Sequence, residues 1–375
     1  MKRVIIIFLL LALLPLRSLA LEPEGKGVIL MEASTGTVLF EKDADLPLAP
    51  ASVTKVMTML LIMEAVDSGA IHWEDAVTAS ASAAAKGGSQ VYLKEGETMT
   101  VRDMLKSIAV SSANDCACAM AEHIAGSEEA FVERMNQRAR ELGMEHTHFV
   151  NCTGLDDGPE AAEHKTTARD IAVMSRELLT KHPHIREFTT IWMDTIRNGA
   201  FGLSNTNKLV RFYPGATGLK TGFTASAMYC LSATAERDGM ELIAVVMGAP
   251  SSAARFTSCK QLLDYGFAGW GVYAPELPED TAVPVRLGKA ETVGAALKAD
   301  PLLVEKGKLS SIRTETVLEE ELPAPVAEGQ PLGTLRIYAG DELLAELPLT
   351  AESSVEKLTW VDIFLDLLKK TAFGG

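Results

Sequence analysis

The pattern of apolar and polar positions predicts a mixed α/β fold over most of the chain. Two short apolar runs at 27–31 and 36–40, separated by a polar turn, are typical of a β-hairpin. Apolar residues then continue over 52–66 and stop before Gly69, which predicts a helix that is buried on most sides. Further helices are predicted at 100–110, 113–125, 128–142 and 167–180, and further strands at 226–236 and 240–249.

The pattern changes after Trp270, where short alternating runs are interrupted by prolines. Runs such as 281–285 and 335–338 alternate as strands with one buried face do, so a small all-β domain is expected to begin near residue 270. The final segment, 358–373, has Trp360 and other apolar residues at helical spacing, with charged residues on the opposite side. It predicts an amphipathic helix that either lies in a membrane interface or packs against the β domain.

The first twenty residues have the pattern of a secretory signal peptide. Lys2 and Arg3 precede an apolar run at 4–16, and Ser18-Leu19-Ala20 supplies the small residues that signal peptidase requires. An uncleaved N-terminal anchor is the alternative interpretation. Both interpretations predict that the protein is exported.

Composition and charge narrow the possible functions. The 375 residues are 47% hydrophobic, which is ample for a globular core, and the formal net charge of −15 makes a nucleic-acid partner unfavourable. Five cysteines at irregular spacing do not form a disulfide framework. Neither a His-Glu-x-x-His motif nor metal-ligand spacing of cysteine and histidine is present, so no metal site is predicted.

The first candidate for chemistry is Ser52-Val53-Thr54-Lys55, at the start of the predicted buried helix. The spacing from Ser52 to Lys55 places the hydroxyl and the amine on one helical face. A desolvated lysine can remove the proton of a serine hydroxyl and make it nucleophilic. Taken alone, the motif is weak and favours the ordinary interpretation, with Ser52 as a helix N-cap and Lys55 as a solvated side chain.

Two further short motifs contain groups that suit a peptide substrate. Ser112-Ala113-Asn114 lies in a turn between predicted helices, where the hydroxyl can relay a proton and the amide can bond to a peptide carbonyl. Lys220-Thr221-Gly222 lies in a predicted edge strand, where glycine allows close approach and Lys220 and Thr221 can contact a carboxylate. Each motif alone is also typical of ordinary turns and strands.

The order and spacing of the three motifs resemble the penicillin-recognising serine enzymes. The chain is similar over almost its whole length to low-molecular-mass penicillin-binding proteins, which are serine-type D-alanyl-D-alanine carboxypeptidases. The resemblance also includes Asn151-Cys152-Thr153-Gly154-Leu155 and the segment 243–249. It implies the mixed α/β penicillin-recognising fold, with an antiparallel sheet covered by helices on both faces, and a small all-β C-terminal domain.

The resemblance also implies a role for each site residue. Ser52 would be acylated with Lys55 as base, and Ser112 and Asn114 would move protons and orient the peptide. Lys220, Thr221 and Gly222 would line the opposite wall. The backbone N–H groups of Ser52 and Phe223 would form the oxyanion hole, and Arg255 would hold the terminal carboxylate. Phe223 stands where some relatives carry a polar side chain, which could alter turnover.

The implied function is removal of the terminal D-Ala from peptidoglycan stem peptides ending in D-Ala-D-Ala, without a cofactor and with inhibition by β-lactam antibiotics. A D,D-endopeptidase, a β-lactamase of the same fold and a non-catalytic wall-binding protein are the alternatives. The expected organisation is a signal peptide at 1–20, a D,D-peptidase domain at 21–270, a β-rich domain at 271–352 and a tail at 353–375. The expected location is the outer face of the cell membrane or the cell wall, with secretion and peripheral membrane contact through the tail as possibilities.

Overall fold

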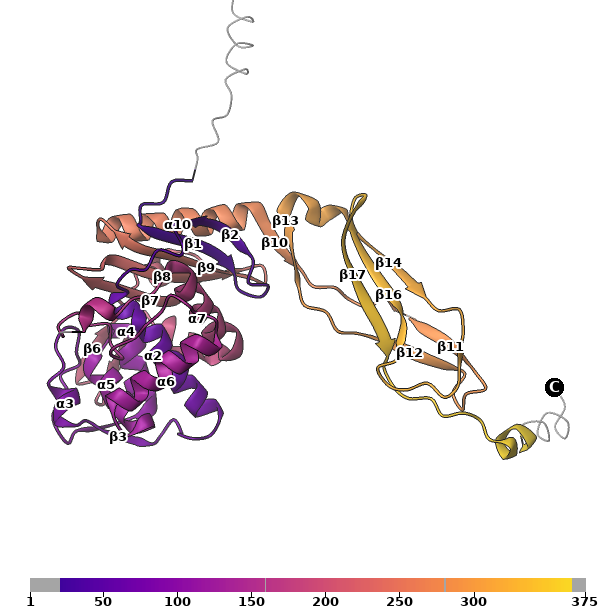
Figure 1. Cartoon of the computed structure of the whole chain (residues 1–375), viewed down its shortest axis with the longest axis horizontal. Coiled ribbons are helices and arrows are strands. Elements are labelled where there is room, and N and C mark those ends of the chain that lie inside the picture. Colours follow the sequence, from indigo (N-terminus) through magenta and orange to yellow (C-terminus); the bar gives the residue numbers. More distant parts are fainter. Residues whose placement is uncertain (1–20, 159, 280, 366–375) are drawn as a thin grey trace, which may run out of the picture.

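The computed structural model describes residues 21–158, 160–279 and 281–365, which form a broad N-terminal part and a narrow C-terminal β domain (Figure 1). The predicted signal peptide and residues 366–375 of the predicted tail helix lie outside the described residues. In Figure 1 the β domain extends away from the N-terminal part, so the molecule is elongated.

The N-terminal part is built on a five-stranded antiparallel sheet with the order β2-β1-β9-β8-β7. Its strands are β1 (Gly27–Glu32), β2 (Val38–Lys42), β7 (Ala216–Thr224), β8 (Met228–Arg237) and β9 (Met240–Ala249). The strands β1 and β9 are buried at every position, which explains the apolar runs at 27–31 and 242–249. As predicted, β7 is an edge strand.

Helices cover both faces of this sheet because successive side chains of each strand point to opposite sides. Val28 and Leu30 belong to the buried cluster beneath α10, whereas Ile29 and Met31 belong to the cluster shared with α2 and α7. The main helices are α2 (Lys55–Asp67), α4 (Val101–Ser111), α5 (Asn114–Ala125), α6 (Glu128–Glu141), α7 (Ala168–Lys181) and α10 (Ser252–Gly269). The predicted mixed α/β fold is confirmed.

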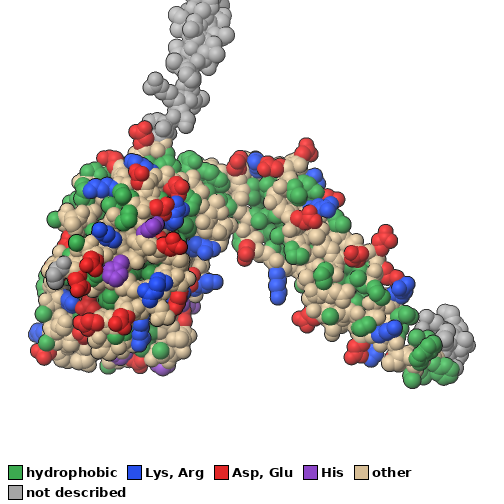
Figure 2. Space-filling view, viewed as in Figure 1, with side chains coloured by type: hydrophobic (Ala, Val, Ile, Leu, Met, Phe, Trp, Pro, Cys, Tyr) green, Lys and Arg blue, Asp and Glu red, His purple; other side chains and the backbone are tan. Residues whose placement is uncertain are grey.

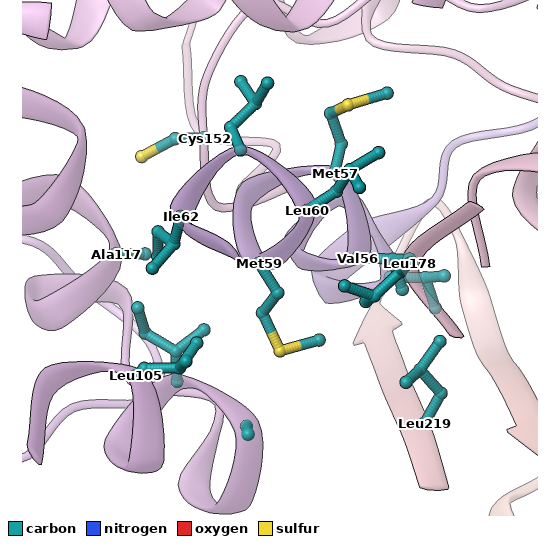
Figure 3. Packing of buried hydrophobic residues seen from close by; sticks show 14 of the residues in the cluster. Val56, Met57, Met59, Leu60, Ile62, Leu105, Ala117, Cys152, Leu178 and Leu219 are labelled. Atoms are coloured by element: carbon teal, nitrogen blue, oxygen red, sulfur yellow. The ribbon is translucent and has the colours of Figure 1, made fainter. Parts of the chain in front are cut away.

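Helix α2 lies at the centre of the larger cluster, and its residues 55–63 are all buried (Figure 3). Met57 and Met59 project from different sides of the helix, and both are fully buried. Neighbours from other elements include Leu105 of α4 and Leu178 of α7. A helix that is apolar all round needs such a position, and its first turn, Ala51–Thr54, is a tighter 3-10 turn.

The remaining elements of the N-terminal part are short. They are β3 (Ala76–Thr78), α3 (Ala81–Ala84), β4 (Thr98–Thr100), α8 (Arg186–Thr189), β5 (Met193–Ile196), β6 (Phe201–Ser204) and α9 (Leu209–Phe212). The predicted hairpin, helices and strands agree with the structure to within a few residues. Helix α10 was not predicted, because Arg255, Ser258 and Gly266 interrupt its buried apolar positions.

The C-terminal domain has its own six-stranded sheet with the order β14-β16-β17-β12-β11-β15. Its strands are β11 (Ala282–Arg286), β12 (Thr292–Leu297), β14 (Ile312–Leu318), β15 (Leu322–Pro323), β16 (Pro331–Ala339) and β17 (Glu342–Ala351). Strand β10 (Trp270–Tyr273) leads from α10 and pairs with β13 (Leu302–Glu305). A separate buried cluster lies on this sheet. It includes Val355, so the packing continues past the expected boundary at residue 352.

The described start of the tail leaves the β domain as a capped helix. Residues 360–365 are helical. Thr359 Oγ1 accepts a hydrogen bond from Asp362 N (3.2 Å), and the Asp362 carboxylate accepts one from Thr359 N (2.8 Å), which is a reciprocal capping box. Within the described ranges, no helix combines the length and the apolar character that crossing a bilayer requires.

Candidate active site

Ser52 and Lys55 meet where the 3-10 turn passes into α2. Lys55 Nζ lies 3.0 Å from Ser52 Oγ and donates a hydrogen bond to the backbone oxygen of Thr153 (2.8 Å). The lysine side chain is completely buried, whereas Ser52 is partly exposed. Burial lowers the pKa of Lys55 to about 7, against the opposing influence of Cys152 and Asp115. The amine can therefore be neutral near pH 7 and accept the serine proton.

The turn that contains Thr153 is shaped to fit against the 3-10 turn. Asn151 Oδ1 accepts hydrogen bonds from the backbone N–H groups of Thr153 (3.1 Å) and Gly154 (2.7 Å). Gly154 has a φ of +80°, and a Cβ at this position would lie 1.8 Å from the backbone oxygen of Ala51. Only glycine fits here, and the close contact brings the Thr153 carbonyl within reach of Lys55.

Sequence analysis did not identify His164, which supports the same turn from the other side. His164 Nδ1 accepts a hydrogen bond from Val150 N (3.2 Å), so Nε2 carries the proton and donates to Thr54 Oγ1 (2.8 Å). Burial, with smaller contributions from His148 and Lys55, lowers the pKa of His164 to about 4. The ring is therefore neutral. A lone histidine far away in the sequence gives no signal of this contact.

Ser112 and Asn114 lie in the junction between α4 and α5. Ser112 is buried and adopts the left-handed conformation with a φ of 63°, which is a strained backbone for a residue other than glycine. Asn114 Nδ2 donates to the backbone oxygen of Gly87 (2.7 Å), while its Oδ1 has no partner. The sequence suggested that this amide would bond to a peptide carbonyl. The free atom is instead an acceptor, which suits a peptide N–H.

Lys220, Thr221 and Gly222 form the edge of β7 that faces the 3-10 turn. Lys220 Nζ donates to the backbone oxygen of Thr221 (2.8 Å), and the Thr221 hydroxyl donates to Thr206 Oγ1 (2.7 Å). A Cβ on Gly222 would lie 2.8 Å from Pro50 O and 3.1 Å from Ser52 N. Glycine thus allows β7 to approach Ser52 closely.

Two like charges and burial act on Lys220. The side chain is 1% exposed. Burial lowers its pKa well below the ordinary value, and the positive charges of Lys55 and Arg255 lower it further. A negatively charged substrate group in this space would offset that repulsion.

Arg255 lies behind the same strand, at the start of α10. Its Nη1 donates to the backbone oxygens of Gly222 (2.9 Å) and Cys230 (3.3 Å). Its guanidinium carbon lies 5.4 Å from the ring centre of Tyr229 and 4.9 Å from that of Phe256. The arginine therefore fixes β7 and β8 together, a structural role that the sequence did not indicate.

The buried side-chain polar atoms that lack a hydrogen-bond partner, among the described residues, belong to residues of this site. They are Ser112 Oγ, Asn114 Oδ1 and Arg255 Nε. Buried polar atoms are almost always paired, so unpaired ones need an explanation. All three belong to residues that the sequence assigned to substrate contact. Within the described ranges, no group of three or more His, Cys, Asp or Glu side chains is arranged to hold a metal ion.

Comparison with known proteins defines the class to which this site belongs. Residues 17–251 match the family model described as D-alanyl-D-alanine carboxypeptidase, and residues 277–357 match that of the penicillin-binding protein 5 C-terminal domain. The chain belongs to the D-alanyl-D-alanine carboxypeptidase family. The resemblance found in the sequence is confirmed, as is the activity of a serine D,D-carboxypeptidase of the cell wall, acting outside the cytoplasm.

Individual relatives match the chain over two thirds to nearly all of its length. D-alanyl-D-alanine carboxypeptidase DacF of Bacillus subtilis is 41% identical over 362 residues, covering 95% of this chain and 91% of the relative. The crystal structure of penicillin-binding protein 5 from Haemophilus influenzae has 30% identity and a TM-score of 0.75, covering 90% of this chain and 98% of that one. Penicillin-binding protein D2 of Listeria monocytogenes, in its ampicillin-bound form, has 32% identity and a TM-score of 0.60, covering 66% of this chain and 99% of that one.

Proposed function

We propose that Ser52 is the nucleophile of this D,D-carboxypeptidase and that neutral Lys55 is its general base. The observation that carries the proposal is the 3.0 Å contact between Ser52 Oγ and the buried amine, whose pKa is about 7. Ser52 Oγ bonds to the carbonyl carbon of the penultimate D-Ala as its proton passes to Lys55 Nζ. The serine ester forms and the terminal D-Ala leaves with a proton; water then hydrolyses the ester.

The other site residues take complementary parts in these steps. The backbone N–H groups of Ser52 and Phe223 stabilise the oxyanion, which the close approach of Gly222 to Ser52 N supports. Ser112, whose hydroxyl has no protein partner, passes the proton to the leaving amine. Asn114 Oδ1 accepts a hydrogen bond from a backbone N–H of the substrate.

The terminal carboxylate of the substrate binds between Lys220, Thr221 and Arg255. The mutual repulsion of the buried cations favours an anion here. Arg255 Nη1 already donates hydrogen bonds to the backbone of β7 and β8, whereas Nε has no partner. The substrate carboxylate therefore binds on the Nε side of the guanidinium. A charge-assisted hydrogen bond of this kind is worth about 1.5–3 kcal/mol.

β-Lactam antibiotics acylate the same serine. A lactam carbonyl imitates the scissile amide, and the Listeria relative has been crystallised with ampicillin and with cefotaxime. The acyl-enzyme from a β-lactam deacylates slowly because the leaving group remains attached. The enzyme is therefore both a carboxypeptidase and a target of penicillins.

The protein is exported by its N-terminal signal peptide and touches the membrane through its C-terminal tail. Trp360, Val361, Phe364 and Leu365 are all at least half exposed. Hydrophobic side chains gather at this end of the β domain, next to the grey residues of Figure 2. Aromatic and aliphatic side chains on a capped helix suit a membrane interface, and the domain would hold the active site away from it.

Product analysis tests the proposed function. A pentapeptide ending in D-Ala-D-Ala is incubated with the mature enzyme and with Ser52→Ala, and the products are identified by mass spectrometry. The enzyme should release one D-Ala and leave a tetrapeptide, whereas Ser52→Ala should leave the peptide intact. Equal hydrolysis by both proteins would show that Ser52 is not the nucleophile.

A further inference from the structure

Phe223, which directly follows the Lys-Thr-Gly segment, forms a pair of aromatic side chains with the half-buried Tyr229. Phe223, the next residue of β7, is 55% exposed although the residues before it are buried. Tyr229 lies opposite it in β8, and the two ring centres are 4.4 Å apart with an interplanar angle of 33°. Stacking between the rings stabilises an apolar surface that faces solvent at the mouth of the site.

The position of this pair follows from the period of the strand. Thr221 and Phe223 are two residues apart, so their side chains leave β7 on the same face. Tyr229 also contacts Arg255, whose guanidinium carbon lies 5.4 Å from its ring centre. The aromatic pair therefore borders the space between Thr221 and Arg255, to which the proposed function assigns the carboxylate of the leaving residue.

The turn that follows Phe223 holds the pair in place. Thr224 Oγ1 accepts a hydrogen bond from Ala227 N (3.1 Å), which closes the turn between β7 and β8. Ser226 Oγ donates to Asp156 Oδ2 (2.6 Å) and ties the turn to the loop after Thr153. A surface fixed in this way can discriminate between substrates, because little order is lost when a substrate packs against it.

We propose that Phe223, supported by Tyr229, selects the residue that leaves the substrate. This inference rests on the proposed function and deepens it. The methyl group of a terminal D-Ala packs against the Phe223 ring while its carboxylate faces Arg255. A leaving residue with a longer charged side chain, such as D-Lys, would bring its charge against the ring and lose hydration. The enzyme therefore prefers a leaving residue with a small apolar side chain to one with a long charged side chain.

Steady-state kinetics on three peptides that differ only in the last residue test this inference. The peptides end in D-Ala-D-Ala, D-Ala-Gly and D-Ala-D-Lys, and kcat/KM is measured for each. In the wild type, kcat/KM should be roughly fourfold higher for D-Ala than for Gly, which corresponds to the free energy of burying one methyl group. The value for D-Lys should be lower still. Phe223→Ser should bring the ratio of kcat/KM for D-Ala to that for Gly, and the ratio for D-Ala to that for D-Lys, close to one.

Matched variants separate the side-chain role from general damage. Phe223→Leu keeps an apolar surface and should retain the preference for D-Ala over D-Lys. Tyr229→Phe keeps the stacked ring and should behave as the wild type, whereas Tyr229→Ala should weaken both preferences. The melting temperature of each variant is measured. If Phe223→Ser does not fold, the comparison of Tyr229→Phe with Tyr229→Ala shows whether the aromatic surface selects the leaving residue.

The outcomes distinguish this inference from the proposed function. If Phe223→Ser and Tyr229→Ala fold and hydrolyse the peptides with wild-type ratios, Phe223 does not select the leaving residue and the inference is wrong. If the wild type hydrolyses none of the three peptides, the proposed function itself fails. A wild type that prefers D-Lys to D-Ala would also overturn the inference.

Discussion

Lys55 illustrates how a single residue acquires its function from its surroundings. Its amine lies in the core of the protein, and its hydrogen-bond partners, Ser52 Oγ and Thr153 O, are neutral oxygens. Without a directly bonded carboxylate, burial dominates and lowers the pKa to about 7. A lysine that would be a cation at the surface can therefore serve as the proposed base near pH 7.

The rate of acylation should depend on pH with an inflection near 7. Below that pH Lys55 is protonated and cannot accept the Ser52 proton, and above it the amine is neutral, so the rate should rise and then level off. Stopped-flow measurement with a fluorescent penicillin between pH 5 and 9 gives this profile. Lys55→Arg stays protonated throughout and should acylate about 10²–10⁴-fold more slowly. A flat profile for the wild type would contradict the role of Lys55 as base.

The site could be predicted from the sequence only where side chains act at a fixed spacing. The three-residue step from Ser52 to Lys55 corresponds to one helical turn, and the 3.0 Å contact between the two side chains agrees with it. The segment 151–155 was part of the resemblance, but the contact of the Thr153 carbonyl with Lys55 could not be predicted, because any residue supplies a backbone oxygen. His164 was missed for a related reason, since its contact with Thr54 depends on the tertiary fold.

At the scale of elements, the site depends on how closely β7 approaches the 3-10 turn. Gly222 has no side chain, and a side chain at this position of β7 would collide with Pro50 and Ser52. The edge position of β7 leaves the backbone groups of its outer side free for a substrate. The distance between β7 and the 3-10 turn therefore sets the geometry of the proposed oxyanion hole.

Gly222→Ala should impair catalysis far more than folding. Its Cβ would lie 2.8 Å from Pro50 O, so β7 must move outward, and a displacement of about 1 Å at a reacting centre costs about 10²-fold in rate. The acylation rate with penicillin is the measurement. Gly202→Ala in β6 is the matched control, because nothing lies within 4 Å of the added methyl group. Equal rates for the two variants would show that the close approach is unimportant.

The elements could be predicted where their apolar pattern is simple. β9 and most of α2 are buried on all sides and appear in the sequence as long, mostly apolar runs. Helix α10 was missed because it buries Arg255 and Ser258 among its apolar residues, for reasons that lie in other elements. Arg255 is buried because its guanidinium bonds to the backbone of β7 and β8.

At the scale of the whole molecule, the two sheets have separate buried clusters and meet at β10 (Figure 1). The change of pattern near residue 270 predicted this transition, because prolines and short alternating strands differ from the long apolar runs before them. The strand order and the elongated shape could not be predicted, since they depend on pairings between distant segments. The far end of the β domain carries the exposed apolar residues of the tail.

Removal of the tail should abolish membrane binding without affecting stability. The chain should end at Leu358 rather than earlier, because Val355 is buried and Leu358 N donates to the Leu287 oxygen. The shortened protein should keep its melting temperature and carboxypeptidase activity but no longer sediment with anionic lipid vesicles. The double variant Trp360→Ser, Phe364→Ser in the full chain should bind vesicles more weakly. If the full mature protein ignores vesicles, or the truncation lowers the melting temperature by several degrees, the tail belongs to the domain core.

The most direct test of the account is the identity of the residue that a penicillin labels. The mature protein is incubated with penicillin, digested, and analysed by tandem mass spectrometry, with Ser52→Ala as the control. One adduct is expected on Ser52 and none on the variant, because the Ser52 hydroxyl is the one that the proposed base Lys55 contacts. An adduct on Ser111 or Ser112, or a label that persists in Ser52→Ala, would contradict the account.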